Sequence, residues 1–499
     1  MKKLVQTTVI GAILASTLLI LLTPRTSWAV PSYSRRYGVE CSVCHSMWGA
    51  LNGTGATFKL SGYRAFFGSD LEPVSKDVEL GAGFTIPTTL PLSLVAGVGY
   101  DYRTEKRDAA NGTSNTKTGS SFDLEDSSIF LSSPLGKHLS VFAEFPMYET
   151  RAWEFTPVGP AQSNDTSKGG NIKFSTEKPG FEVAKFFWNN LLEDSTPRDS
   201  LNLLFGITHM PLAYSPGKVR LSVNQYLIYE RRAMDLLSHK NVDNLFTGDQ
   251  NDSLLRDSEP QVLAEVYGMV VPGKNVSDVA SKETFWFEYH LGATNGDNAN
   301  ANNNKQVGGY GRYVMRWYGQ TMGVFAFYKS DIYDDGIRSD ASVANGGIMS
   351  GKSSSNSHYR IGPDLTISGV PYGVPLWLEN QYMYVSESNP TGFGKRFTWQ
   401  GGFDQLNCQI AKKMVGYGRY DWVRGGLYND MSTTMNGVTG LTNTHPKEYD
   451  IVAGLQYTIA SNVKLVAEYR YHEFTDTASK PNTSKLSDTG GTARIMFGF

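Results

Sequence analysis

Two cysteines and a histidine stand together near the start of the chain, as Cys41-Ser42-Val43-Cys44-His45. The spacing C-x-x-C-H is the attachment signature of a c-type haem. Each thiol can add to a haem vinyl group, and the adjacent imidazole then reaches the iron. The alternatives are a chance C-x-x-C, a small disulfide, or half of a zinc site, which would need two more ligands nearby. We expect Cys41 and Cys44 to anchor one covalently bound haem c, with His45 as the proximal iron ligand.

The second axial position of such a haem has no ligand nearby in the sequence. The next histidine is His138, and Met47 is too close in sequence to His45 to reach the opposite face of the ring. Either the position is open or the rest of the chain supplies a ligand. A methionine there would raise the reduction potential. The candidates, each of which could equally be an ordinary strand or loop residue, are Met147, His209 and Met210.

Residues 1–29 have the features of a signal peptide. Lys2 and Lys3 precede an uncharged apolar run, and Ser27-Trp28-Ala29 resembles a cleavage site. An uncleaved anchor is the alternative, but the run is short for a membrane span. Removal of this segment takes away basic residues from a chain of net charge −2, so the mature chain is acidic and gives no reason to expect nucleic acid as a partner. The remaining cysteine, Cys408, has no evident partner, and we expect no structural disulfide.

The haem signature lies in a short segment, residues 30–75, that is too small to be stable by burial alone. Leu51, Gly55, Phe58 and Gly62 recur at helical spacing. Glycines weaken a helix, so their use here suggests that something must approach the helix closely. A flat porphyrin is such a group, and we expect it to pack here. A helix packed against protein is the alternative. Aromatic side chains that could wall a haem are Phe58, Tyr63, Phe66 and Phe67.

Residues 76–499 have the pattern of a transmembrane β-barrel. The chain ends in Ala493-Arg494-Ile495-Met496-Phe497-Gly498-Phe499, which alternates apolar residues and closes on an aromatic residue, as bacterial outer-membrane barrels do. Segments of about ten residues that alternate apolar and polar side chains are what a membrane strand requires. We expect an all-β antiparallel barrel of about 16 strands, with 14 or 18 as alternatives. The expected strands are 91–103, 121–133, 139–149, 200–209, 217–230, 258–271, 281–294, 308–318, 321–330, 358–369, 375–386, 396–406, 411–424, 449–459, 463–472 and 493–499.

Polar stretches rich in Gly and Asn separate these strands and are expected to be extracellular loops: 108–118, 295–304, 339–357 and 429–444. The acidic pairs Glu125-Asp126 and Asp334-Asp335 are expected at solvated loop ends, or at the pore mouth if they meet a cation. No nucleophile–base arrangement, phosphate loop or H-E-x-x-H motif occurs. The sequence therefore gives no catalytic residues for acid–base or nucleophilic chemistry.

This order of parts resembles the fused monohaem cytochrome–porins of the bacterial outer membrane, best known as ferrous-iron oxidases. The resemblance departs at Ala56, where the family often has arginine. Over the barrel it is architectural only. The residues that carry it are Pro31-Ser32-Tyr33, Arg35, Gly38, Cys41-x-x-Cys44-His45, Leu51-Asn52, Gly55, Phe58-Lys59 and Gly62-Tyr63.

The resemblance implies an electron-transfer oxidoreductase in the outer membrane. It would take electrons from an extracellular donor, Fe(II) in the family, and pass them to a periplasmic c-type cytochrome. Electron export to an extracellular acceptor is a variant of the same function. The alternative of a different class is a solute porin whose haem is a structural or sensory plug. Because a haem free in the periplasm would be too distant from an outside donor, we expect the cytochrome module in the barrel lumen or at its periplasmic mouth.

Overall fold

The protein is described here by a computed structural model. The residues that it describes are 31–40, 43–47, 50–64, 73–74, 76–108, 114–148, 182–192, 195–214, 221–238, 257–272, 285–296, 307–332, 355–390, 396–428, 434–435, 438–439, 445–460, 462–476 and 484–498. The expected signal peptide, together with Cys41, Phe66, Phe67 and Asp334-Asp335, lies outside them.

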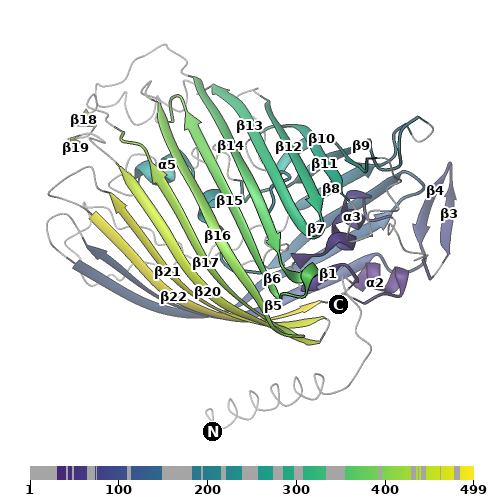
Figure 1. Cartoon of the computed structure of the whole chain (residues 1–499), viewed down its shortest axis with the longest axis horizontal. Helices are drawn as coiled ribbons and strands as arrows, with labels where there is room; N and C mark the ends of the chain where they lie inside the picture. The colour runs from purple at the N-terminus through teal and green to yellow at the C-terminus, as the bar shows by residue number, and fades with distance from the viewer. Residues whose placement is uncertain are drawn as a thin grey trace, which may run out of the picture.

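Sixteen antiparallel strands form a closed barrel, in which β22 pairs with β5 to complete the ring (Figure 1). The expected fold and strand number are both confirmed. The barrel strands are β5 (Leu92–Asp108), β6 (Ser114–Pro134), β7 (Leu139–Tyr148), β8 (Val183–Trp188), β9 (Asn202–Thr208), β10 (Gln261–Val270), β11 (Trp286–Thr294), β12 (Gly308–Trp317), β13 (Gln320–Ile332), β14 (Ser355–Ser368), β15 (Leu376–Glu387), β16 (Phe397–Ala411), β17 (Met414–Gly425), β20 (Pro446–Ala460), β21 (Val463–Asp476) and β22 (Ser484–Gly498).

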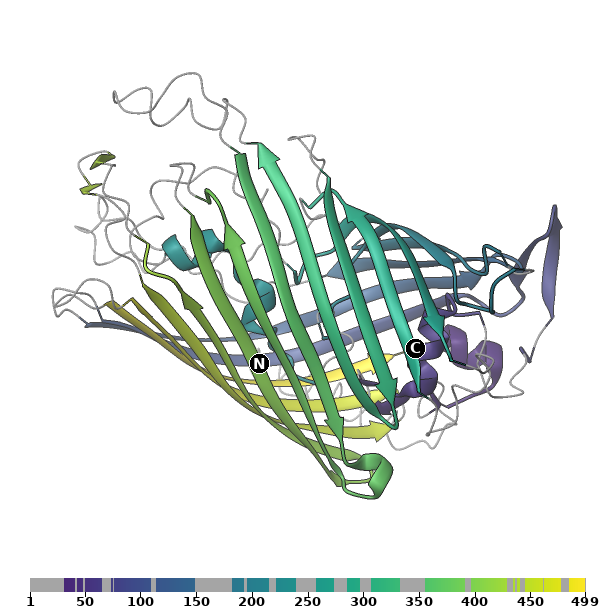
Figure 2. The same cartoon turned by 45° about the horizontal axis from the view of Figure 1, so that its top comes forward.

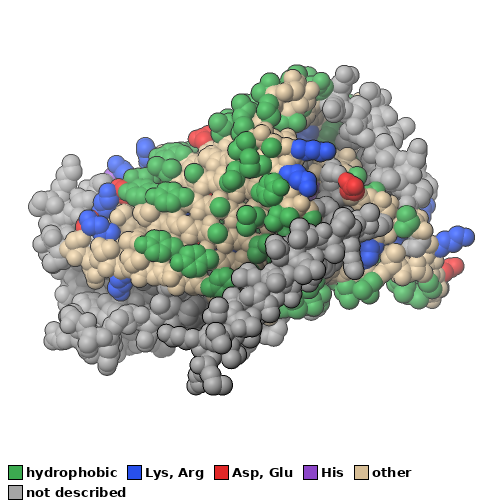
Figure 3. Space-filling view, turned by 90° about the horizontal axis from the view of Figure 1, so that it is seen from below, with side chains coloured by type: hydrophobic (Ala, Val, Ile, Leu, Met, Phe, Trp, Pro, Cys, Tyr) green, Lys and Arg blue, Asp and Glu red, His purple; other side chains and the backbone are tan. Residues whose placement is uncertain are grey.

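Side chains alternate between a polar lumen and an apolar outer surface. On β21, Leu465 and Tyr469 are 42% and 51% exposed, whereas Glu468 and His472 between and beyond them are each 4% exposed. A strand turns successive side chains to opposite faces, so this pattern places the carboxylate and imidazole inside. The outer surface is apolar over many strands, as Figure 3 shows for one face. A closed barrel with such a surface spans a membrane, because all its backbone groups are paired within the wall. The protein is therefore an outer-membrane β-barrel.

The two ends of the barrel differ in the length of their connections. Residues 318–319 join β12 to β13, and residues 412–413 join β16 to β17, at one end. At the other end the connections are long, for example 333–354 between β13 and β14. Outer-membrane barrels have short periplasmic turns and long extracellular loops, which assigns the short-turn end to the periplasm. Among the described residues, no helix is long and apolar enough to cross a membrane.

The segment that carries the haem signature lies at the periplasmic end (Figures 1 and 2). Its helix α3 is shorter than the expected helical pattern, so Leu51 and Gly62 lie outside it. A hairpin of two short strands then leads into β5. The elements are α2 (Pro31–Tyr37), β1 (His45–Met47), β2 (Ala50–Leu51), α3 (Gly53–Leu60), β3 (Asp77–Gly81) and β4 (Phe84–Pro87).

Two of the expected barrel strands need correction. The part of 217–230 that the structure describes is not a strand: it runs inside the barrel and includes the short helix α4 (Leu227–Glu230), followed by α5 (Ala233–Ser238). The sixteenth strand is instead β8, between β7 and β9. The expected number was thus reached with one wrong strand and one missed strand.

Smaller corrections concern loops. Strands β5 and β6 stay paired as far as Asp108 and Ser114, so the expected loop 108–118 is mostly strand. The pair Glu125-Asp126 lies within β6 rather than at a loop end. Minor elements outside the barrel are the pair β18 (Thr434–Met435) and β19 (Val438–Thr439), and the 3-10 turn η8 (Val370–Tyr372).

Candidate functional site

The haem signature follows helix α2 in the chain, and its last residue, His45, begins a short two-stranded ladder. The backbone N–H of Val43 donates to the carbonyl of Glu40 at 3.1 Å. His45 opens β1 and pairs with Leu51 of β2. Cys44 and His45 are both half-buried. Of the three predicted haem-binding residues, the structure thus describes these two, side by side in the chain.

Asn52 fixes the signature to α3. Its side-chain Nδ2 donates to the carbonyl of Val43 at 3.0 Å, and its backbone N–H donates to the carbonyl of Cys44 at 2.9 Å. Its Oδ1 accepts from the backbone N–H of Gly55 at 2.9 Å, which makes Asn52 the N-cap of α3. One side chain therefore satisfies backbone groups of both the signature and the helix.

Gly55 is required by the close approach of the protein backbone. A Cβ built on Gly55 would lie 2.1 Å from the carbonyl oxygen of Cys44, far inside a van der Waals contact. Gly62 has φ +66°, and a Cβ there would lie 2.4 Å from Asn189 Oδ1 on the barrel. Both glycines therefore allow close approach of protein atoms, and the packing of a porphyrin against this segment stays a prediction.

Gly55→Ala is expected to disturb the signature, because the new methyl group must push Cys44 away from α3. We expect a loss of about 2–4 kcal/mol in the stability of this segment, the cost of overpacking plus strained contacts. Gly53→Ala is the matched control, since nothing lies within 4 Å of its Cβ position. Proteolysis of the folded barrel, followed by the release of the N-terminal segment, measures the difference. Equal protection of the two variants would contradict this role of Gly55.

An aromatic shell surrounds Val43 and Cys44. Phe58 and Tyr37 are each 3% exposed and form the centre of this cluster. The Phe58 ring lies edge-on to Tyr33, with 5.1 Å between centroids, and Tyr33 stacks on Tyr63 at 5.2 Å. Such packing excludes water from one side of the signature, which is what the surroundings of a haem require to set its potential.

Burial governs the protonation of this shell. It is the largest cause that raises the pKa of the Tyr33 hydroxyl well above its usual value, and Tyr63 beside it adds to the effect. Burial likewise raises the pKa of Tyr63. Burial lowers the pKa of Lys59 on α3, against the opposing attraction of Glu288. The tyrosines therefore stay neutral at physiological pH and place no charge beside Cys44.

The segment is held against the inner wall of the barrel at its periplasmic end. The hydroxyl of Ser140 on β7 donates to the carbonyl of Gly62 at 2.6 Å. Ser32 contacts β6 through the hydroxyl of Ser132 at 3.0 Å. Ser132 and Ser140 are 3% and 1% exposed, so both face inward. Several independent contacts therefore place α2 and α3 on the inner side of β5–β8.

Tyr63 adds aromatic contacts with the wall. Its ring stacks on Phe142 of β7, with 5.4 Å between centroids, and lies edge-on to Phe187 of β8 at 5.7 Å. Lys185 Nζ lies 5.9 Å from the centroid of Tyr63 and 5.1 Å from that of Phe142. The ammonium group is held over ring faces, an arrangement stabilised by cation–π attraction.

The structure separates the three candidate distal ligands. Met147 is 50% exposed near the far end of β7, seven residues beyond Ser140, or about 23 Å along a strand. It is not brought to His45. His209 and Met210 follow β9 and enter the lumen, where Met210 is 1% exposed in a large apolar cluster that also contains Leu60 of α3. Met147 is thus the worst placed of the three, and His209 and Met210 remain the candidates for a distal ligand.

The residues present fit a covalent haem c. Cys44 and His45 are adjacent, each has an accessible part, and the backbone around them is fixed by Asn52. Apolar rings lie on one side of Cys44. A thiol and an imidazole in one turn, beside a dry aromatic shell, are the donor set that haem c attachment needs. Among the described residues, no group of three or more His, Cys, Asp or Glu side chains is arranged to hold a metal ion.

A second feature of the lumen is the segment 221–237, whose first ten residues belong to the expected strand 217–230. Tyr226, Leu227, Ile228 and Tyr229 have no exposed surface. The Tyr226 ring stacks on Phe403 of β16 with 3.8 Å between centroids. Four consecutive buried residues cannot alternate between lumen and lipid, so this segment lies wholly inside the barrel. We call it the inner segment.

Glu468 of β21 holds the start of the inner segment. Its carboxylate accepts hydrogen bonds from the backbone N–H groups of Val223 and Asn224 at 3.0 and 3.1 Å, and from the hydroxyl of Ser222 at 2.7 Å. Tyr417 of β17 donates to the same carboxylate at 2.6 Å. Hydrogen bonds to a charged group are among the stronger ones in proteins. Glu468 therefore joins the inner segment to the wall.

Arg419 and Glu448 continue the attachment. Arg419 donates to the carbonyls of Asn224 and Gln225 at 2.9 and 3.1 Å. Glu448 of β20 pairs with Arg231 at the end of α4. Arg419 also pairs with Asp421 at 3.0 Å, and both side chains are fully buried. These charged residues were missed by sequence reasoning, although inward positions on strands β17, β20 and β21 are the signal that could have found them.

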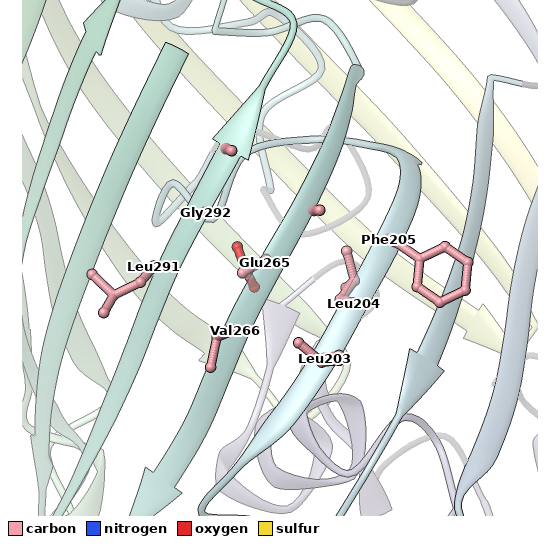
Figure 4. A pocket seen from close by; sticks show the side chains of 9 residues that line it. Leu203, Leu204, Phe205, Glu265, Val266, Leu291 and Gly292 are labelled. Atoms are coloured by element: carbon pink, nitrogen blue, oxygen red, sulfur yellow. The ribbon is translucent and has the colours of Figure 1, made fainter. Parts of the chain in front are cut away.

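The depression drawn in Figure 4 lies in the barrel wall rather than in the lumen. It is lined by residues of β9, β10 and β11, with Ala264 and Ala293 paired across the two strands. Phe205 and Leu291 at its rim are 47% and 61% exposed on the lipid-facing surface. Small residues between large ones leave a depression in this apolar, lipid-facing surface.

Comparison with known proteins finds likeness in fold among solved structures. The outer membrane channel DcaP of Acinetobacter baumannii is 10% identical, with a TM-score of 0.44 over 85% of this chain and 99% of that chain. An anion-selective porin from Comamonas acidovorans is 10% identical, with a TM-score of 0.42 over 82% and 99%. OprB of Pseudomonas putida is 11% identical, with a TM-score of 0.42 over 82% and 94%. No protein-family model and no curated protein matches the chain. Likenesses at these values assign no function.

Proposed function

We propose that this outer-membrane barrel is an electron conduit. One haem c, attached through Cys41 and Cys44 and ligated by His45, would take electrons from an extracellular donor, with Fe(II) favoured by the family resemblance. A periplasmic c-type cytochrome would receive them. The observation that carries the proposal is the position of the C-x-x-C-H segment, which is packed by Ser140, Tyr63 and their neighbours on the inner wall at the periplasmic end.

The residues of this chain have a limited role in such a function. A bound haem would supply reversible one-electron chemistry at its iron. Asn52 fixes the backbone of the signature, and Tyr33, Phe58 and Tyr63 exclude water beside it. A one-electron step needs no general acid or base, which agrees with the lack of catalytic motifs in the sequence.

The inner segment favours an electron conduit rather than an open pore. A wide water-filled lumen is what 16-stranded porins use for solute passage. Here Tyr226 to Tyr229 fill part of that lumen, and the residues just before them are hydrogen-bonded to Glu468 and Arg419 of the wall. Electrons can cross packed protein, whereas hydrated solutes cannot.

The test of haem attachment is the mass and the haem content of the exported protein. We expect one covalently bound haem per chain, measured by denaturing mass spectrometry and by the alkaline pyridine spectrum. Cys408→Ser is the control and should leave the haem content unchanged, because Cys408 lies on β16 in the barrel. A chain that carries no haem after export in a strain able to attach haem c would overturn the proposal.

A solute channel is the second candidate, favoured by the charged lining of the lumen. Arg312 pairs with Asp364 at 2.9 Å, and Arg470 pairs with Asp450 at 2.9 Å, all on inward positions of the wall. Paired charges of both signs are typical of porin lumens that pass polar solutes. Steady conductance of the intact protein in a planar bilayer, unchanged by loss of the haem, would favour this function instead.

A further inference from the structure

The hairpin β3–β4 presents an apolar face that the barrel and the helices leave uncovered. Val78 and Ile86 are cross-strand partners, 46% and 39% exposed. Phe84, two positions before Ile86 and so on the same face, is 46% exposed, and Leu80 beside the turn is 62% exposed. An exposed two-stranded element with four large apolar side chains is a hazard for aggregation unless something covers it.

The other face of the hairpin is bound to the protein. Nη1 and Nη2 of Arg36 in α2 each donate a hydrogen bond of 2.8 Å to the Asp77 carboxylate. The backbone N–H of Thr85 approaches the carbonyl of Leu135, in the turn between β6 and β7, at 3.5 Å. Pro87, the partner of Asp77, is buried. These contacts hold the hairpin in place at the periplasmic end, where Figures 1 and 2 show it beside α2.

The apolar face continues the lipid-facing surface of the barrel. Strand β4 leads through Leu90, 62% exposed, to Leu92, 39% exposed at the first position of β5. Leu92 pairs with Leu131 on β6, where the outer wall begins. In Figure 3, apolar side chains reach the end of the molecule at which β3 and β4 lie. Exposed lysines flank this region, Lys76 before β3 and Lys137 in the turn after β6.

We propose that the β3–β4 hairpin inserts its apolar face into the periplasmic leaflet of the outer membrane. Its occupant is phospholipid: acyl chains against Val78, Leu80, Phe84 and Ile86, and headgroup phosphates near the two lysines. Interfacial elements of this kind bury an apolar face by about 5–10 Å at the headgroup boundary. The Arg36–Asp77 pair then connects that anchor to α2, which leads directly to the haem signature. The hairpin thereby fixes the depth of the N-terminal segment relative to the membrane.

The test is photo-cross-linking with the full chain. Phe84 is replaced by p-benzoylphenylalanine, and the protein is irradiated in vesicles of phosphatidylethanolamine and phosphatidylglycerol and then in intact cells. Glu79 receives the same group as the matched control, because its partner Thr85 places it on the opposite face. Tyr100, 46% exposed on the outer wall, is the positive control. Mass spectrometry identifies each adduct.

We expect phospholipid adducts at position 84 in a yield within about twofold of that at position 100. The yield at position 79 should be at least about fivefold lower than at position 84. Position 80 serves as a second site if the variant at 84 does not insert. A covalent dimer, a cross-link to a periplasmic protein in cells, or no lipid adduct at both 84 and 80 would overturn the proposal. None of these outcomes depends on whether haem is bound, so they do not bear on the proposed electron transfer.

Discussion

Cys44→Ser is expected to abolish covalent haem attachment and electron transfer while leaving the barrel inserted in the membrane. The hydroxyl of serine cannot form the thioether, so the C-x-x-C-H signature for haem attachment is lost. The side chain is half-buried and small, so the fold itself should lose no more than about 1 kcal/mol. Haem content and donor oxidation by whole cells are the measurements.

Cys408→Ser is the matched control for this change. It removes a thiol from the same chain, at a half-buried position on β16 far along the sequence from the signature. Heat-modifiable migration of both variants reports whether the barrel has formed. If cells with Cys44→Ser oxidise the donor at the normal rate, the proposed role of the haem is wrong.

Glu468→Ala is expected to release the inner segment and to open the lumen. The change removes the acceptor of four donors from the inner segment and of the Tyr417 hydroxyl, and leaves Asp421 as the paired carboxylate of Arg419. Breaking a buried charged network by removing one member costs about 3–5 kcal/mol. Since the barrel wall keeps its backbone pairing, most of this loss should fall on the inner segment. Single-channel conductance in a planar bilayer should rise from near zero to that of an open pore.

The same strand offers a control for this variant. Glu473 also accepts hydrogen bonds from tyrosines, Tyr449 at 2.8 Å and Tyr471 at 2.6 Å, but it lies an odd number of residues from Glu468 and is bonded to none of the described residues of the inner segment. Glu473→Ala should leave conductance unchanged. Equal conductance of the Glu468→Ala and Glu473→Ala variants would show that the inner segment does not close the barrel.

The barrel could be predicted from the sequence because each membrane strand must alternate apolar side chains that face lipid with polar side chains that face the lumen. We call this the alternation rule. On β21 the rule gives Leu465 and Tyr469 outside and Glu468 inside, and the expected strand there is confirmed. The rule fails where a strand faces protein on the inside. On β8, Phe186, Phe187 and Trp188 are all apolar, because Phe187 packs on Tyr63 of the N-terminal segment while its neighbours face lipid.

The inner segment shows the converse failure. Its sequence alternates well enough to resemble a strand, yet residues 226 to 229 are all buried because the segment lies inside the barrel. Local pattern cannot tell a lipid-facing position from one packed within a lumen. The charges that hold the segment, at Glu468 and Arg419, come from strands about 200 residues later in the chain. Because these contacts join residues far apart in the chain, no local sequence pattern could have revealed them.

The haem signature itself was readable because its chemistry is local. Two thiols and an imidazole within five residues need no tertiary structure to be recognised. A distal ligand, by contrast, must come from a distant segment, and Met147 and Met210 could not be distinguished until the strands were placed. The protein contacts of Gly62 could not be predicted for the same reason, since the atoms close to it belong to β7 and β8 or the turn after β8.

Anaerobic visible spectroscopy of the purified, oxidised protein mixed with Fe(II) tests the proposed function most directly. We expect the sharp bands of a reduced haem c to appear rapidly, because the haem accepts one electron from each ferrous ion. Dithionite provides the fully reduced reference. A haem that dithionite reduces and Fe(II) leaves oxidised would contradict the uptake of electrons from iron, and would leave electron export or a solute channel in its place.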